Sequence, residues 1–325
     1  MGSMGGYRGW CCRVTSAGVF EPYASGIRSP AGLGIDPDGR LLYAENQGEY
    51  MGSSKLSYLY KDHFYGHPSS LVSLPGMKPD SPEIAYDKWQ KSTEVSALWF
   101  PYEKLSNSPG NPTWDLSGGK FGPFGRQMFI GDQTLSTLMR ITTEKVGEVD
   151  QGCIIPFASK LSSGVMRPCF LPDGSLFVGQ TGRGWQAYGG NESSLQRIFW
   201  DGKTTAAEIQ RVAVTPSGFE IFLTTPMAET LTAEETLANI SVESWSYLDS
   251  PQYGSDENEK HPDSVSSAVI SADRKSVKFN VENFATPAAI NRIYAIKLTN
   301  AKQLLTPANA RDKLEAYYTV RAVPR

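Results

Sequence analysis

The side chain best suited to acid–base chemistry in this sequence is His67. It lies in the string FYGHP, where Gly66 and Pro68 fix a turn beside the ring. Histidine is neutral near pH 7 and can take up a proton during a reaction, so His67 is the candidate catalytic base. The alternative is a ring that bonds to the backbone of a loop between strands. The other two histidines, His63 and His261, lie in less constrained segments.

The string TGRGW at 181–185 combines a cation with an aromatic surface. Arg183 can attract an anionic ring system, and Trp185 can stack on a quinone or a sugar ring. The flanking glycines, Gly182 and Gly184, permit backbone angles that other residues avoid, which favours a shaped loop. The alternative is that Trp185 packs between sheets while Arg183 stays in water.

Polar side chains that end three apolar segments form a second group of candidates. Gln47, Gln133 and Gln180 offer amide donors and acceptors to a cofactor or a sugar. Asp132, like Glu45 in the first segment, offers carboxylate oxygens, which are ligands that calcium prefers. The alternative is that these glutamine and acidic side chains cap strands and connect neighbouring sheets.

These candidates share a position in a repeated sequence unit of turn, apolar strand and polar end. The glutamine spacing corresponds to a repeat of about 43 residues, with one degenerate unit between the first two, and this is the size of a four-stranded propeller blade. A further strand follows each glutamine, with Leu56, Leu138 and Leu195 aligned. The units are IDPDGRLLYAENQG at 35–48, FGPFGRQMFIGDQT at 121–134 and PDGSLFVGQTGRGW at 172–185.

A propeller would bring the polar ends of these units together. The tight DPDG-type turns would lie on one face, and the polar ends would lie on the opposite face around one axis. We therefore expect a shared top-face pocket that is formed by Gln47, His67, Asp132, Gln133, Gln180, Arg183 and Trp185.

The pattern changes after about residue 203. Short strands separated by turns are typical of a small immunoglobulin- or fibronectin-like β-sandwich. Hairpins are predicted at 208–227 and 267–284, a closing strand at 291–298, and short helices at 232–239 and 307–316. The predicted all-β chain therefore has β-propeller blades over 7–203, a β-sandwich over 204–300 and a C-terminal tail over 301–325.

Composition excludes several classes of partner. The 325 residues carry a net charge of -3, and no run of lysine or arginine marks a surface for nucleic acid or an anionic membrane. No segment is apolar for long enough to insert into a membrane, and the start has no signal-peptide pattern and is typical of an expression tag. The four cysteines lack metal or haem spacing, and they leave open a disulfide between Cys153 and Cys169 or four free thiols.

The repeated units resemble the propeller of soluble quinoprotein glucose/sorbosone dehydrogenases, in particular the divergent relatives found in large secreted bacterial proteins. The strings FYGHP and GQTGRGW are specific to that branch, and the segment after residue 203 is similar to the domain that follows such propellers. The resemblance covers much of residues 7–200. Besides the units above, it rests on FEPYASGIRSPAGLG at 20–34 and KDHFYGHPSSLV at 61–72.

The resemblance implies a six-bladed propeller in a periplasmic or secreted protein that oxidises a sugar or polyol with the quinone PQQ and calcium. At about 43 residues per blade, 7–200 holds only four to five blades. The propeller is therefore expected to be incomplete or to close unusually, and further domains of a larger chain are expected. In this hypothesis His67 is the base, Asp132 binds the metal, and the cofactor is bound by Gln47, Gln133, Gln180, Arg183 and Trp185.

Two other functions stay open. The chain fits a non-catalytic propeller that binds carbohydrate or protein within a secreted assembly, because one fold hosts many functions. It also fits a polysaccharide lyase or hydrolase, for which Glu45, Glu49, Asp115 and Asp132 are available as paired carboxylates. The distinguishing feature is whether the central pocket gathers a base and cations, or only aromatic and amide groups.

Overall fold

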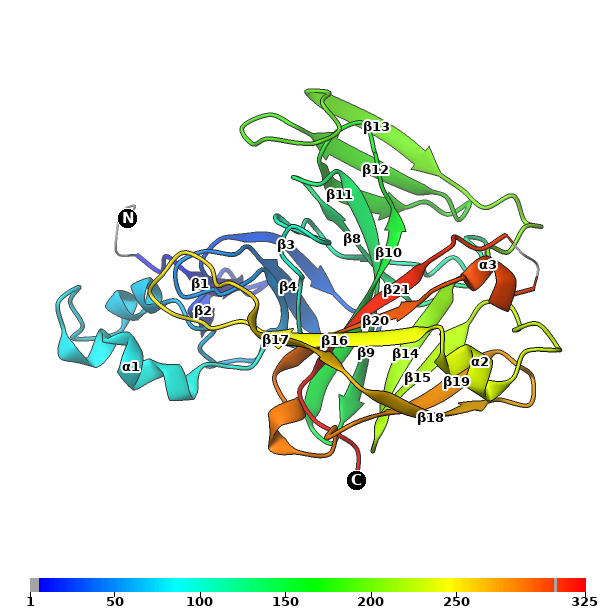
Figure 1. The fold of residues 1–325 in the computed structure, drawn as a ribbon. Helices are drawn as coiled ribbons and strands as arrows, with labels where there is room; N and C mark the ends of the chain where they lie inside the picture. Colours follow the sequence, from blue (N-terminus) through cyan, green and yellow to red (C-terminus); the bar gives the residue numbers. More distant parts are fainter. Residues whose placement is uncertain (1–5, 307–308) are drawn as a thin grey trace.

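The computed structural model describes residues 6–306 and 309–325, which fold into antiparallel sheets joined by loops and very short helices (Figure 1). The all-β prediction is confirmed. Two sets of sheets are seen: blade-like sheets in the first two thirds of the chain, and a sandwich in the last third. In the part of the chain that is described, no helix is long and apolar enough to cross a membrane.

The first blade is a meander of four strands in chain order. Its tight turn at residues 36–40 is held by the Asp36 carboxylate, whose Oδ1 accepts hydrogen bonds from the backbone N–H groups of Asp38 and Arg40. This is the turn chemistry that aspartate favours. The strands are β3 (Pro30–Ile35), β4 (Leu41–Glu45), β5 (Lys55–Tyr58) and β6 (Leu98–Trp99).

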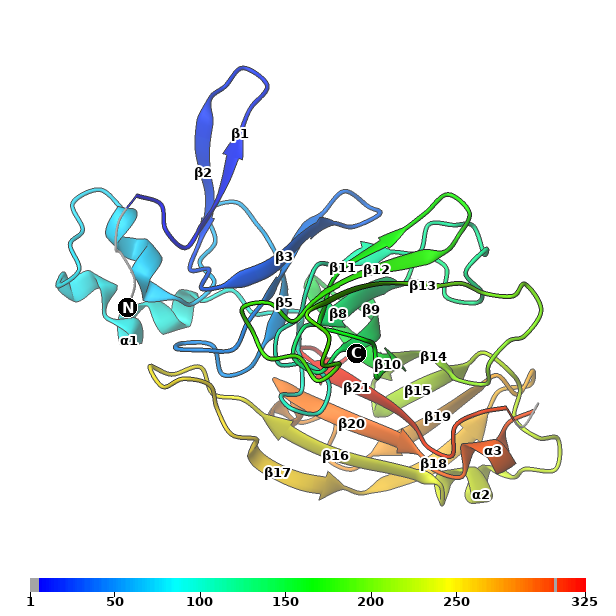
Figure 2. The same cartoon turned by 90° about the horizontal axis from the view of Figure 1, so that it is seen from above.

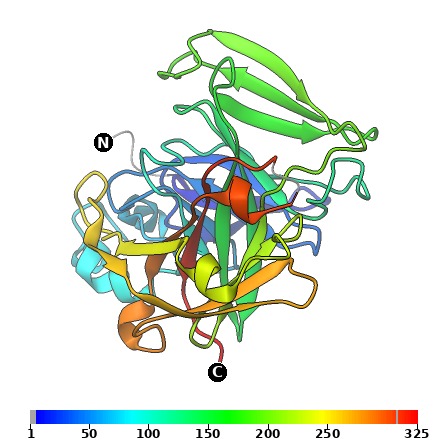
Figure 3. The ribbon, with the colours of Figure 1, turned by 45° about the vertical axis from the view of Figure 1, so that its right-hand side comes forward.

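Two further blades follow, and their strands are also arranged in chain order. The second is again a four-stranded meander, and the third has three strands and stands apart from the rest of the molecule in Figure 3. The strands of the second blade are β7 (Thr113–Trp114), β8 (Met128–Asp132), β9 (Thr137–Val146) and β10 (Val149–Ala158); those of the third are β11 (Val165–Phe170), β12 (Leu176–Thr181) and β13 (Ser193–Ile198).

Strand pairing confirms the predicted alignment of the leucines. Leu56, Leu138 and Leu195 lie opposite Ala44, Gly131 and Gly179 in their blades. The glutamine alignment was wrong, because the residues that occupy equivalent strand ends are Glu45, Asp132 and Gln180. Gln47 and Gln133 therefore lie in the loops just after β4 and β8, whereas Gln180 lies within β12.

Residues 59–97 do not form the degenerate blade that the repeat spacing predicts. Prolines and charged side chains interrupt any alternation of apolar residues there, and the segment forms short helices beside the first blade (Figure 1). These are η1 (Pro68–Ser73), η2 (Pro82–Ile84), α1 (Tyr86–Trp89) and η3 (Gln90–Ser92). The N-terminal hairpin, β1 (Trp10–Val14) and β2 (Phe20–Ser25), projects from the same region in Figure 2.

The last third of the chain forms two sheets that pack on each other. One sheet has the order β14-β15-β19-β18, and the other contains β17-β16-β20-β21. Phe219 and Phe279 of the first sheet share a buried core with Ile296 and Tyr318 of the second. The strands are β14 (Ile209–Thr215), β15 (Gly218–Leu223), β16 (Ile240–Ser246), β17 (Asn258–Asp263), β18 (Val265–Ile270), β19 (Ser276–Val281), β20 (Arg292–Leu298) and β21 (Leu314–Val320).

The sandwich and the second blade share one sheet of eight strands, because β10 pairs with β21 as well as with β9. Strand β21 falls in the segment that the sequence indicated as a tail, and it lies between β20 and β10. The predicted domain boundary near residue 204 is therefore crossed by backbone pairing between Gly152–Ile154 and Tyr317–Thr319.

Short helices complete the sandwich. Helix α2 (Ala233–Leu237) occurs where predicted, and a reciprocal capping box between Thr232 and Glu235 fixes its start. The other predicted helix was wrong over its described residues: 307–308 lie outside them, residues 309–313 form no helix, and Leu314–Val320 forms strand β21. Helix α3 (Ala301–Leu304) and η4 (Pro287–Ala289) were not predicted. All four cysteines are free thiols.

Candidate functional site

The top face carries a cleft of about 800 Å³ between the blade loops and a loop of the sandwich. It lies at the strand ends opposite the tight turns, which is where the repeat predicted a site. We call it the top-face cleft. Its lining residues are Arg28, Ser29, Asn46, Gln47, Tyr102, Asn107, Ser108, Gln133, Thr134, Gly184, Trp185, Gln186, Tyr188 and Tyr253.

The three equivalent strand-end residues shape this cleft from beneath. Glu45 accepts hydrogen bonds from the backbone N–H groups of Arg28 and Ser29, in the loop that leads into the first blade. Asp132 accepts from the loop that leads into the second blade, and Gln180 Oε1 accepts from Ser163 N in the loop that leads into the third. The equivalent position at the strand end of each repeat therefore carries a side chain whose oxygen accepts hydrogen bonds from the loop before that blade.

Asp132 shows how fully these acceptors are used. Its Oδ2 accepts from Ser106 Oγ at 2.6 Å, Asn107 N at 2.8 Å and Ser108 N at 2.6 Å, and its Oδ1 accepts from Leu135 N at 2.6 Å. Burial raises the pKa of Asp132, although the four hydrogen bonds favour the charged form. A carboxylate so engaged has little capacity for calcium, and no group of three or more His, Cys, Asp or Glu side chains in residues 6–306 and 309–325 is placed to hold a metal ion.

Two of the predicted glutamines and a neighbouring asparagine line the cleft. Gln47 donates from Nε2 to Gly52 O, which keeps its amide in one orientation. Gln133 contributes its side chain from the β8–β9 loop. Asn46 has a buried Oδ1 with no hydrogen-bond partner among the described residues. A buried acceptor without a partner is costly, so Asn46 is suited to receive a donor from a ligand or a water.

Exposed aromatic rings surround the cleft. Trp185, Tyr188 and Tyr253 are 55%, 72% and 61% exposed, and the Trp185 ring is held by a hydrogen bond from Nε1 to Thr134 Oγ1. Trp185 was predicted. Tyr188 follows three residues later on the same loop, which was a usable signal, but no motif indicated Tyr253.

Tyr253 reaches the cleft because the sandwich loop docks on the β4–β5 loop. Tyr50 N donates to Ser250 O, Gly52 N donates to Asp249 Oδ1, and Gly254 N donates to Gly48 O. Gly254 has a φ of +71°, and a Cβ there would lie 2.6 Å from Gln47 Cδ. A glycine is therefore required for this close approach.

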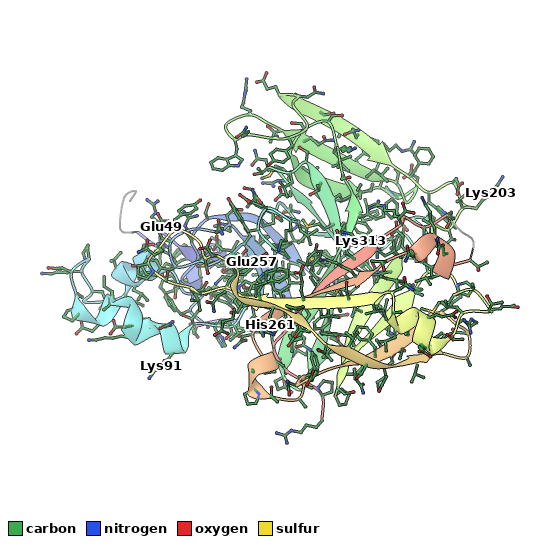
Figure 4. All side chains as sticks on the ribbon, viewed as in Figure 1. Glu49, Lys91, Lys203, Glu257, His261 and Lys313 are labelled. Atoms are coloured by element: carbon green, nitrogen blue, oxygen red, sulfur yellow. The ribbon has the colours of Figure 1, made fainter. Side chains whose placement is uncertain are left out.

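Arg28 is the cation of the cleft lining, and its charge is already compensated. Its Nε and Nη2 donate to Glu49 Oε2, and its Nη1 donates to Gln47 O; Glu49 is labelled in Figure 4. The guanidinium also lies 5.2 Å from the centre of the Tyr253 ring. No motif in the sequence indicated Arg28, because its partners come from a different loop.

The remaining predicted residues lie outside the lining. Gln180 is buried beneath the cleft, and Arg183 is at the surface, where its Nε pairs with Glu192 Oε1 at 3.0 Å. His67 caps helix η1: its Nδ1 accepts from Ser69 N and lies 2.7 Å from Ser69 Oγ. Its role as a catalytic base stays a prediction, and the geometry gives it a capping role.

His67 should make folding sensitive to acid. Burial, followed by the charge of Arg28, lowers the pKa of His67 from 6.5 to about 4. As the pH is lowered, His67 therefore takes up a proton at a higher pH in the unfolded chain than in the folded chain. Its contribution to the free energy of unfolding is fully present above pH 6.5 and is lost as the pH falls toward 4. Allowing for partial solvent screening, we expect a loss of about 2 kcal/mol from this group.

Chemical denaturation of His67→Asn between about pH 7 and pH 4 measures this effect. Asparagine Oδ1 can replace the Nδ1 acceptor but does not titrate, so the variant should lose less stability on acidification than the parent chain. His63→Gln, which removes a half-exposed histidine, is the matched control. An unchanged pH slope in His67→Asn would contradict the assignment.

Comparisons with known proteins give no family assignment: no protein-family model matches, and no curated protein matches. Solved structures with partial similarity include a glucose dehydrogenase-type oxidoreductase from Thermus thermophilus, with 20% identity and a TM-score of 0.36. Another is the PQQ-bound form of an aldose sugar dehydrogenase from Streptomyces coelicolor, with 15% identity and a TM-score of 0.34. Each match covers 55% of this chain, which spans about half, 46%, of the other chain.

A fungal alcohol oxidase in complex with copper aligns over 94% of this chain and 79% of its own, with 11% identity and a TM-score of 0.21. The assignment of this protein to the all-β class rests on its own strand pairing.

Proposed function

We propose that the top-face cleft binds a carbohydrate and that the protein acts as a carbohydrate-binding module. The observation that carries the proposal is the composition of the lining: exposed aromatic rings of Trp185, Tyr188 and Tyr253 stand around amide and hydroxyl groups. Exposed large aromatic side chains gathered at a concave surface are typical of an interaction site.

The chemistry of the lining matches a neutral, hydroxyl-rich ligand. The amides of Asn46, Gln47 and Gln133 both donate and accept hydrogen bonds, as sugar hydroxyls do. The faces of pyranose rings carry C–H groups that pack on aromatic rings, and Trp185 and Tyr253 offer such surfaces from two different loops. The compensated charge of Arg28 leaves the cleft without a strong preference for an anion.

The lining offers little for catalysis. Among the described residues that line it there is no histidine, lysine or carboxylate, so no side chain there is suited to take up a proton near pH 7. Paired carboxylates for a hydrolase are also missing from the described lining. Glu45, Asp115 and Asp132 are buried, and the exposed Glu49 is paired with Arg28 at 2.9 Å.

The sugar or polyol oxidation implied by the sequence resemblance is the second candidate. It would use the same cleft, with Trp185 stacked on the acidic tricyclic quinone that such enzymes carry. The residues present do not fit this group well, because the donors of Arg28 are engaged by Glu49 and Gln47 and Asp132 already accepts four hydrogen bonds. A periplasmic or secreted location would suit either function.

Calorimetric titration with a panel of neutral oligosaccharides tests the first proposal. We expect binding to weaken about tenfold or more in Trp185→Ala, equivalent to about 1.4 kcal/mol, because the stacking surface is lost. Phe199→Ala is the matched control, since Phe199 is 64% exposed and is not part of the cleft lining. Equal binding by Trp185→Ala and the parent chain would overturn the proposed site.

The same protein should be titrated with PQQ in the presence of calcium. We expect no saturable binding and no reduction of dye with any sugar that binds. Tight binding that is lost in Trp185→Ala, together with sugar-dependent dye reduction, would instead establish the oxidoreductase.

A further inference from the structure

A second cleft, of about 500 Å³, lies at the opposite end of the blades from the top-face cleft. It is bounded by the end of β5, the segment before β6, the β9–β10 turn and the end of β21. Its apolar surface includes Val95, Ala97 and Ile290. None of the sequence candidates for function falls in it.

Two of the three acidic groups in this cleft are paired with a lysine or arginine, and the third lies against a histidine. Asp150 is paired with Arg40 at 2.7 Å and also accepts a hydrogen bond from Tyr60 Oη at 2.6 Å. Glu94 lies 2.6 Å from His63 Nδ1, and Glu148, which is almost fully exposed, lies 3.8 Å from Lys145. None of these three carboxylates forms an ion pair with the further cation that lines the cleft.

Arg321 is that further cation. It is only 7% exposed, lines the cleft, and forms no ion pair with any carboxylate of residues 6–306 and 309–325. Its guanidinium lies 4.1 Å from the centre of the Trp99 ring. Burial lowers the pKa of Arg321 to about 9, although Asp249 acts in the opposite direction. The group is still charged near pH 7, and a buried charge without a counter-ion is costly.

The hydrogen bonds of Arg321 use one N–H of each terminal nitrogen. Nε donates to Ser96 O, Nη2 donates to Ser96 Oγ, and Nη1 donates to Asn291 Oδ1. Each terminal nitrogen carries a second N–H. Two such donors match the two oxygens of a carboxylate, which is the geometry that guanidinium groups favour.

We propose that this cleft is a binding site for a small organic carboxylate, with the carboxylate on Arg321 and an apolar body against Val95, Ala97 and Ile290. The ligand supplies a carboxylate in direct contact with Arg321, whereas Asp249 acts on its charge without an ion pair between them among the described residues. The site is independent of the top-face cleft and of the carbohydrate-binding function proposed for it.

Benzoate is a suitable probe, and benzamide is its neutral counterpart of the same shape. Titration by calorimetry and by thermal unfolding should show saturable binding of benzoate, with at least tenfold weaker binding of benzamide. Inorganic phosphate, added as a separate arm, should bind at least tenfold more weakly than benzoate, because it has no apolar body. Equal responses to benzoate and benzamide, or no binding of benzoate to the folded chain, would overturn the proposal.

Two variants locate the site. Arg321→Gln should weaken benzoate binding at least tenfold. Because Arg321 also holds Ser96, a variant that leaves the guanidinium in place is needed as well: Val95→Trp, at a position 54% exposed, should fill the mouth of the cleft and weaken binding to a similar degree. Trp185→Ala, in the top-face cleft, should bind benzoate as the parent chain does. Unchanged affinity in folded Val95→Trp would contradict the site even if Arg321→Gln failed to fold.

Discussion

Replacing Arg140 by methionine is expected to lower the free energy of unfolding by about 3–5 kcal/mol. Arg140 is fully buried between the second blade and the sandwich. It donates to Gln127 Oε1, Ile209 O and Gln210 O, and pairs with Glu208 at 3.2 Å. Methionine fills a similar volume but leaves these acceptors without a donor, which costs more than the hydrogen bonds themselves contribute.

Denaturant unfolding of Arg140→Met measures this effect. Arg126→Met is the matched control, because Arg126 is paired with Asp38 in a surface contact where both side chains are largely exposed. Exposed ion pairs of this kind contribute at most about 1 kcal/mol. If both variants lose the same small amount of stability, the connection between blade and sandwich does not depend on Arg140.

Asp132→Ala should have the second large effect, a loss of about 3–4 kcal/mol in the free energy of unfolding, because the buried backbone donors it satisfies are left unpaired. Those donors belong to Asn107, Ser108 and Leu135. Since Asn107 and Ser108 line the top-face cleft, carbohydrate binding should also be lost. Asp132→Asn keeps part of the acceptor capacity, and it should fall between the alanine variant and the parent chain.

Thermal unfolding with and without calcium completes this test. The hydrogen-bonded Asp132 carboxylate predicts that calcium does not raise the melting temperature of the parent chain. Asp173→Ala is the matched control, because Asp173 accepts equivalent turn hydrogen bonds from Ser175 at an exposed site. Stabilisation by calcium that disappears in Asp132→Asn would restore Asp132 as a metal ligand.

The positions of most strands could be predicted from the sequence, because strand formation depends on local alternation and on turn residues that act over a few positions. The leucine alignment was correct for this reason: Leu56, Leu138 and Leu195 each pair across a neighbouring strand of the same blade. The repeat also predicted the face on which Gln47, Gln133 and Trp185 meet, although its alignment of the glutamines was wrong.

The tertiary structure alone decided which polar residues face the cleft and which hold its loops. Glu45, Asp132 and Gln180 are buried acceptors because each meets loop N–H groups that lie 16 or more positions earlier in the chain. Arg28 and Tyr253 reach the cleft through loop docking, and β21 joins the sandwich to the second blade. Contacts of this kind depend on the packing of distant segments, and no local pattern in the sequence determines them.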